Sequence, residues 1–240
     1  MKPGPQDTLH ELALANRILA HEGVVDDFGH VAWRDPADPG QFWLSRALPP
    51  NAVTAADMRR YGLDGVCEDT TVQSYSEAVL HARIFAARPD VTACIHHHAR
   101  PLLPFTMPGA PPLRPVFHTG SIMGWEVPVW DSAPFGDTGM LVDDVAKADS
   151  LAAALGSHRA ALLRAHGAVV VGDSIARAVM IAIYMAENAA VALACGAPHR
   201  PVPSLSQGEV VETAKRLLTP ATVSRVWAGR LARLPQQGGQ

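Results

Sequence analysis

The chain has 240 residues, 48% of them hydrophobic, which is enough to bury one sizeable core, and nothing resembling a linker divides it. Its formal net charge is -3, from 20 basic and 23 acidic residues, and does not indicate a basic surface that would bind nucleic acid or an acidic membrane. We therefore expect a single domain over residues 1–240 whose partner is a small molecule.

The first elements in chain order are a helix and three strands. Apolar residues recur at helical spacing over residues 7–21 and stop at Gly23, which predicts a helix. Short apolar runs separated by proline, aspartate and glycine then predict strands over residues 30–33, 42–44 and 62–66. Between the last two runs, Thr54 and Asp57 have the spacing of a capping box, which predicts one or two turns of helix.

A second helix and a strand follow. The amphipathic pattern over residues 76–87 predicts a helix whose first turn carries Glu77. The next apolar run, residues 91–97, predicts a strand that leads into three consecutive histidines. Side chains alternate along a strand, so His96 and His98 share one face. Because neutral imidazole is the commonest metal ligand, this pair is placed to bind one ion.

The second half of the chain begins with a region rich in proline and glycine. Residues 99–134 predict loop and edge strand, with short extended stretches at 114–117 and 127–130. After it we expect helices over residues 144–155 and 174–195, strands over 160–163 and 168–171, and a last helix within 208–234. Alternating strand and helix signals predict a sheet covered by helices.

Three features predict a cytoplasmic protein. Residues 1–10 lack the apolar run of a signal peptide. The longest apolar helix, near residues 175–194, is interrupted by Arg177 and Glu187, so no membrane is expected. Cysteines are odd in number and widely spaced, which fits reduced thiols, and we expect all three to be packing residues: Cys67, Cys94 and Cys195.

A further histidine lies in a tight turn between two predicted strands. His166 is flanked by apolar runs, where an isolated polar ring would be costly to bury, so it needs a partner. From the residues alone, two interpretations of the histidines stay open. One is a metal site, and the other is a surface cluster or a set of hydrogen-bonded core residues.

Four motifs, in order, resemble the class II aldolase and adducin family. They are Gly29-His30-Val31 with Arg34, Ser76-Glu77 followed by His81, Arg88-Pro89-Asp90-Val91 leading into His96-x-His98, and Leu163-x-x-His166-Gly167. The resemblance spans nearly the whole chain. It implies a three-layer α/β/α domain with a central, mostly antiparallel sheet, assembled as a homotetramer with sites at subunit interfaces.

The resemblance also assigns roles to site residues. It implies that His96, His98 and His166 bind one divalent ion per subunit, with Zn, Mn, Co and Fe left open. It implies that Glu77 is the catalytic acid/base. Without the resemblance, Glu77 would be an ordinary acid favoured by the helix dipole. His118 lies where the family's aldolases contribute a residue across a subunit boundary, and we interpret it as a second acid or a substrate contact.

The chain departs from the family's sugar-phosphate aldolases at their phosphate pocket. Where those enzymes have asparagine, a Thr-Gly pair and paired serines, this chain has His30, Arg46-Ala47 and Tyr75-Ser76. Arginine suits bidentate binding of a carboxylate, and tyrosine or histidine can lie against a planar ring. These residues therefore predict a carboxylated aromatic substrate. The alternatives are a solvated charge for Arg46 and simple packing for the two rings.

A looser resemblance narrows the function. The segments Phe42-Trp43-Leu44-Ser45-Arg46 and Val53-Thr54-Ala55-Ala56-Asp57 resemble the branch of metal-dependent decarboxylases that act on hydroxylated aromatic and pyridine dicarboxylates. Decarboxylation is therefore the favoured function. The alternatives are an aldolase acting on a sugar phosphate or hydroxy-keto acid, an iron-dependent oxygenase, and a non-catalytic adducin-like binding module. We interpret His81 as a support of the site or a packed residue, and His97 as structural.

Overall fold

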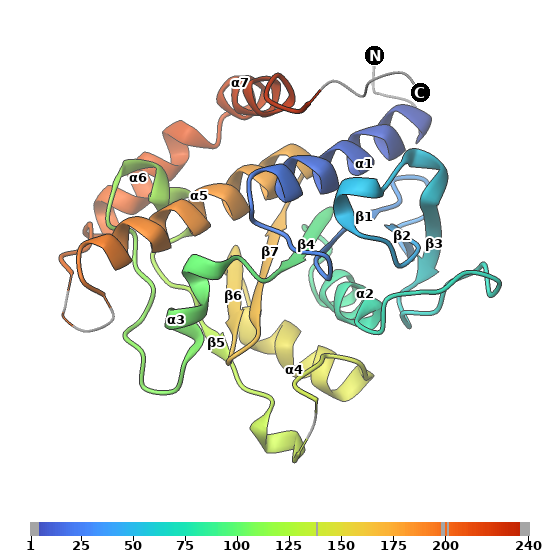
Figure 1. The fold of residues 1–240 in the computed structure, drawn as a ribbon, viewed down its shortest axis with the longest axis horizontal. Coiled ribbons are helices and arrows are strands. Elements are labelled where there is room, and N and C mark those ends of the chain that lie inside the picture. The colour runs from blue at the N-terminus through green and yellow to red at the C-terminus, as the bar shows by residue number, and fades with distance from the viewer. Residues whose placement is uncertain (1–4, 138, 198–199, 201, 236–240) are drawn as a thin grey trace.

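A seven-stranded sheet forms the centre of the molecule (Figure 1). The structure is a computed structural model that describes residues 5–137, 139–197, 200 and 202–235. The strand order is β3-β2-β1-β4-β7-β6-β5, and all neighbours are antiparallel except β5 and β6. The strands are β1 His30–Arg34, β2 Gln41–Ser45, β3 Met58–Gly62, β4 Ala93–His97, β5 Val129–Trp130, β6 Ala160–Leu163 and β7 Gly167–Gly172.

Helices cover both faces of this sheet. They are α1 Pro5–His21, α2 Ala78–Ala87, α3 Leu103–Thr106, α4 Val145–Leu155, α5 Ile175–Ala194, α6 Gln207–Leu217 and α7 Pro220–Leu231. Short 3-10 turns are η1 Pro50–Ala52, η2 Ala55–Asp57, η3 Arg100–Leu102, η4 His118–Met123 and η5 Ala133–Phe135. Figure 1 shows α1 and α5 side by side over one face and α2 and α4 over the other. The expected three-layer α/β/α fold is confirmed.

Strand alternation sends β4 side chains into two separate cores. Ala93 and Ile95 pack with α1 and α5, whereas Cys94 packs with α2 and α4. His96 therefore points toward the layer that contains α2, and His97 points to the opposite face. β4 is a central strand flanked by β1 and β7, so both faces and both edges are buried.

One described helix is long and apolar enough to cross a membrane. This is α5, with a mean hydropathy of 1.4. Within the fold, 67% of that window is buried, because α5 packs along the sheet between α1 and α7. Its apolar residues thus belong to the core.

Several predicted elements differ in the structure. The third strand is β3 at residues 58–62, because residues 62–66 form a turn in which the Asp64 side chain accepts a hydrogen bond from the Val66 N–H. The last helix is two helices, since Pro220 cannot continue α6 and Thr219 instead caps α7. Residues 114–117 form no strand. Cys195 is exposed rather than packed, whereas the other two cysteines are buried.

Candidate metal centre

Two chain segments bring three histidines to one end of β4 and β7. His96 lies in β4 and His98 just after it, while His166 lies in the turn between β6 and β7. Ala165 adopts a left-handed conformation in that turn, with φ 53°. Gly167 allows the close approach of the turn to β4, because an added Cβ would lie 2.4 Å from the His97 carbonyl oxygen. This contact gives a physical reason for the His-Gly pair.

The three imidazoles converge through one nitrogen each. One ring nitrogen from each of His96, His98 and His166 lies within 4.8 Å of the others. The Nε2 atoms of His96 and His98 are 3.0 Å apart. The ring centroid of His166 lies 4.9 Å from the ring centroid of His96 and 4.9 Å from that of His98. The sequence prediction that these three side chains come together agrees with the geometry.

Hydrogen bonds fix the tautomers of His96 and His98. His96 Nδ1 lies 3.2 Å from the Ala168 carbonyl oxygen, which can only accept a hydrogen bond. His98 Nδ1 lies 3.0 and 3.1 Å from the two carboxylate oxygens of Asp26. Both rings therefore carry their proton on Nδ1, which leaves the Nε2 lone pairs directed at each other. Among the described residues no donor stands between those two lone pairs, and a cation would satisfy both.

The third histidine is held in the same way. His166 Nδ1 donates to the Met140 carbonyl oxygen at 3.1 Å, so its Nε2 also has a free lone pair. Burial and the neighbouring His96 ring lower the pKa of His166 to about 4, which keeps the imidazole neutral, as a metal ligand must be. Three neutral nitrogen donors at this spacing fit a divalent ion with open positions for substrate.

Glu77 stands beside the ligand atoms. It occupies the N-cap position of α2 rather than the first turn, and its side chain is buried. Its Oε1 accepts a hydrogen bond from the Val142 N–H at 2.8 Å, and its Oε2 lies 3.4 Å from His96 Nε2 and 3.8 Å from His166 Nε2. Burial raises the pKa of Glu77, but the two histidines and the Val142 N–H outweigh burial and lower it below its ordinary value. Glu77 is thus an ionised carboxylate.

A cavity of about 520 Å³ opens onto these groups. Glu77, His98 and His166 form its polar end. The remaining lining residues supply a mostly apolar wall with a few polar groups: Asp27, Phe28, His30, Ala47, Leu48, Pro49, Gln73, Tyr75, Ser76 and Leu141. The cavity is large enough for a single aromatic ring with substituents.

Three of the four predicted substrate-binding residues line this cavity. Ser76 is exposed within it. Tyr75 donates its hydroxyl to the Leu48 carbonyl at 2.6 Å, so its ring rather than its hydroxyl faces the cavity. His30 lies against Tyr75 at a centroid distance of 4.5 Å, and its Nδ1 lies 2.7 Å from His81 Nε2. The Nε2 atom of His30 is therefore the one available to a ligand.

Two predicted residues lie elsewhere. Arg46 forms an ion pair with Asp57 at 2.8 Å and does not line the cavity, because the carboxylate of its own hairpin holds the guanidinium. His118 is exposed at the start of η4, which packs on α5 and α6, and it does not line the cavity of its own subunit. Its expected role at a neighbouring subunit stays a prediction.

Asp26 is a site residue that sequence reasoning missed. Burial raises its pKa, but His98 and the N–H groups of Phe28 and Gly29 lower it by more, so the group is a carboxylate. It lies next to the Gly29-His30 motif, yet it is 72 positions from the histidine that it holds. No spacing rule connects two such positions before the sheet brings them together. His97 points away from the three converging histidines, as predicted, and is buried.

Known proteins resemble this chain in sequence and fold. The family model described as Class II Aldolase and Adducin N-terminal domain matches residues 10–193. Decarboxylase tropJ of Talaromyces stipitatus is 29% identical over 235 residues, covering 88% of this chain and 87% of that protein. A 3,4-dihydroxyphthalate decarboxylase of Arthrobacter keyseri is 27% identical over 237 residues, covering 93% and 92%. L-fuculose 1-phosphate aldolase from Glaciozyma antarctica shares the fold, with a TM-score of 0.77, 24% identity and coverage of 95% and 88%.

Proposed function

The chain belongs to the class II aldolase and adducin family, and we propose that it is a divalent-metal-dependent decarboxylase of a hydroxylated aromatic or heteroaromatic carboxylate. It is a lyase, as its decarboxylase relatives indicate. One observation carries the proposal. Three histidine lone pairs with no donor between them converge beside an ionised, buried carboxylate, at the polar end of a cavity of about 520 Å³.

His96, His98 and His166 would hold the metal through Nε2. The bound ion would supply Lewis acidity to substrate oxygens, stabilising negative charge that develops on the ring. Imidazole ligands suit Zn, Mn, Co and Fe, so availability decides among them. The Nδ1–H bonds to Asp26, Ala168 and Met140 keep the three rings oriented before any ion arrives.

Glu77 would move the proton. Its Oε1 is held by the Val142 N–H, which leaves Oε2 free to face the substrate. As an ionised group, Oε2 removes the proton of the substrate hydroxyl. The bond between the ring and the carboxylate carbon then breaks. Carbon dioxide leaves, and the electron pair of the broken bond stays on the ring carbon. Glu77 returns the proton to the ring carbon, so the carboxylate is regenerated at the end of each turnover.

The walls of the cavity would select a planar substrate. Phe28, Leu48 and Leu141 offer apolar contacts, and the rings of His30 and Tyr75 are placed to lie against an aromatic face. His30 Nε2 and the Ser76 hydroxyl are the polar groups on this side, so we assign them the contact to a substrate oxygen. Arg46 was predicted for this role, but its pairing with Asp57 removes it from the cavity.

We further propose that the chain acts as a homotetramer in the cytoplasm. The free thiols of all three cysteines support a reducing compartment. His118 is exposed and unused by its own cavity, which supports a role at the site of a neighbouring subunit. Light scattering on the purified protein measures the assembly. If His118→Asn leaves turnover unchanged in a tetramer, that role for His118 is wrong.

The test combines elemental analysis with product identification. Purified protein should contain one divalent ion per chain and release carbon dioxide from dihydroxyphthalates, with no oxygen uptake. An aldehyde product from a sugar phosphate, with no carbon dioxide from any aromatic acid, would instead identify an aldolase. Oxygen consumption during turnover would identify an oxygenase.

A further inference from the structure

A second cavity, of about 400 Å³, lies at the opposite end of the central strands from the metal centre. Val91, just before β4, and Gly172, at the end of β7, line it. The metal ligands lie at the other ends of the same two strands. At roughly 3.3 Å per residue, the five steps from Val91 to His96 separate the two sites by about 17 Å. The two cavities share no lining residue.

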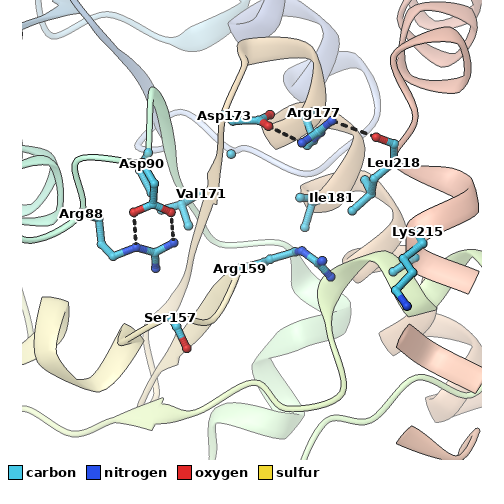
Figure 2. Close-up of a pocket in the computed structure, with 13 residues that line it drawn as sticks. Arg88, Asp90, Ser157, Arg159, Val171, Asp173, Arg177, Ile181, Lys215 and Leu218 are labelled. Atoms are coloured by element: carbon cyan, nitrogen blue, oxygen red, sulfur yellow. Dashed lines mark hydrogen bonds and ion pairs between the residues drawn. The ribbon is translucent and has the colours of Figure 1, made fainter. Parts of the chain in front are cut away.

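Charged side chains dominate the lining of this second cavity (Figure 2). Four are cationic and two are acidic: Arg88, Arg159, Arg177, Lys215, Asp90 and Asp173. Both carboxylates are already engaged. Arg88 binds Asp90 through two contacts of 2.8 and 2.7 Å, and Arg177 is paired with Asp173. The lining therefore has an excess of positive charge that its own acids do not neutralise.

Arg159 is the cation without an acidic partner among the described residues. Figure 2 shows it between the two ion pairs, with no interaction drawn to any neighbour. Its guanidinium donates to the Ile122 carbonyl at 3.3 Å. Burial lowers its pKa, and the nearby Arg177 lowers it further, so the charge is unfavourably placed. A partly buried guanidinium costs free energy unless an anion accompanies it.

Arg177, also in the lining, is held by its neighbours. One end of its guanidinium binds Asp173, and NH2 donates to the Leu218 carbonyl at 2.8 Å. Its Nε is buried and has no partner within the part of the chain that the structure describes. Arg159 is therefore the arginine of this lining whose guanidinium no acid occupies, and its fork matches the paired oxygens of an oxyanion.

We propose that this cavity is a second ligand site, which binds a small molecule carrying a phosphate or carboxylate group on a compact apolar body. Arg159 contacts the oxyanion, and Lys215, whose ammonium is paired with Glu212 at 2.7 Å, lies in the exposed part of the lining. The apolar part contacts the hydrophobic side of the lining, which consists of Val91, Val171, Ile181, Ala214 and Leu218. A volume of about 400 Å³ leaves room for such a body beside the head group.

Calorimetric titration of the metal-loaded protein with inorganic phosphate and, separately, with phthalate tests this site. At least one probe should bind saturably, and Arg159→Gln should weaken that binding by about tenfold or more, since a charge-assisted pair is lost. Arg225→Gln is the matched control. It removes an exposed arginine on α7 outside the cavity and should change nothing.

The controls separate this site from the metal centre. A probe that binds to the metal should bind Arg159→Gln and the parent with equal affinity. Only the part of the affinity that depends on Arg159 therefore reports on the second cavity. If Arg159→Gln folds poorly, Lys215→Ala is the second variant, because it alters a side chain that is 67% exposed. Lys215→Ala should also weaken the binding of the probe. The proposal is wrong if neither probe binds, or if both lining variants bind each probe as the parent does. The probe that binds more tightly identifies the head group.

Discussion

Asp26 provides a quantitative test of how the histidines are prepared for a metal. Its carboxylate accepts the Nδ1–H of His98 at 3.0 Å, and it also accepts the N–H groups of Phe28 and Gly29 at 3.1 and 3.2 Å. Asp26→Asn keeps one oxygen that can accept these N–H groups, but it removes the negative charge. The change therefore tests how the charge of Asp26 supports the His98 tautomer while the hydrogen bonds that hold the loop are kept.

The expected loss of metal affinity follows from the exposure of the pair. Groups that hold a metal-binding histidine typically contribute about 10- to 100-fold to affinity. The side chain of Asp26 is 49% exposed, so solvent screens its charge and the lower end applies. We expect Asp26→Asn to weaken metal binding about tenfold, or about 1.4 kcal/mol. Asp26→Ala also removes the loop hydrogen bonds and should cost more.

Competition with a chromophoric chelator measures this affinity directly. Asp27→Asn is the control, because it removes the same charge one residue away, from a side chain that lines the cavity, whereas the hydrogen bonds to His98 come to Asp26. Equal affinities for Asp26→Asn, Asp27→Asn and the parent would show that the Nδ1 contact does not prepare His98, and the tautomer argument would fail.

Four further outcomes are expected. His96→Ala, which removes one of three ligands, should abolish stoichiometric metal in elemental analysis. Glu77→Gln should keep the metal and lower turnover roughly 10²-fold or more, the usual scale for a positioned acid/base; an active variant would exclude the role. Arg46→Lys should leave the Michaelis constant for a dicarboxylate unchanged, because Arg46 pairs with Asp57 outside the cavity; a marked increase would restore it as an anchor. Gly167→Ala should lower the free energy of unfolding by about 1–3 kcal/mol in denaturant titrations, because the new methyl would overlap the His97 carbonyl.

Local patterns predicted the parts of the fold and site that depend on local rules. Strand alternation was sufficient to place His96 and His98 together and to send His97 to the other face. Helix periodicity likewise predicted α5, and its N-cap in the structure is Ser174. The third strand was missed because Arg59 and Arg60 interrupt its apolar pattern at the edge of the sheet, where each guanidinium pairs with an acid, Asp69 and Asp35 respectively.

Long-range contacts could not be read from the residues alone. His166 joined the site in our sequence analysis only through the family resemblance, since 68 positions separate it from His98. The link between Asp26 and His98 depends on the pairing of β1 with β4. Thr54 and Asp57 were correctly predicted as a capping box, but the same carboxylate also binds Arg46, and that second use became visible only in three dimensions.

The most direct test of the central claim is the carbon dioxide released from a hydroxylated phthalate by metal-loaded, metal-stripped and reconstituted protein. The account predicts that the loaded protein releases one carbon dioxide for each substrate molecule consumed. It predicts no release after the metal is removed, and recovery of the release when one divalent ion per chain is restored. In the same assay, Glu77→Gln should hold its metal and release carbon dioxide at a greatly reduced rate. Undiminished release from the stripped protein, or cleavage to an aldehyde without carbon dioxide, would contradict the account.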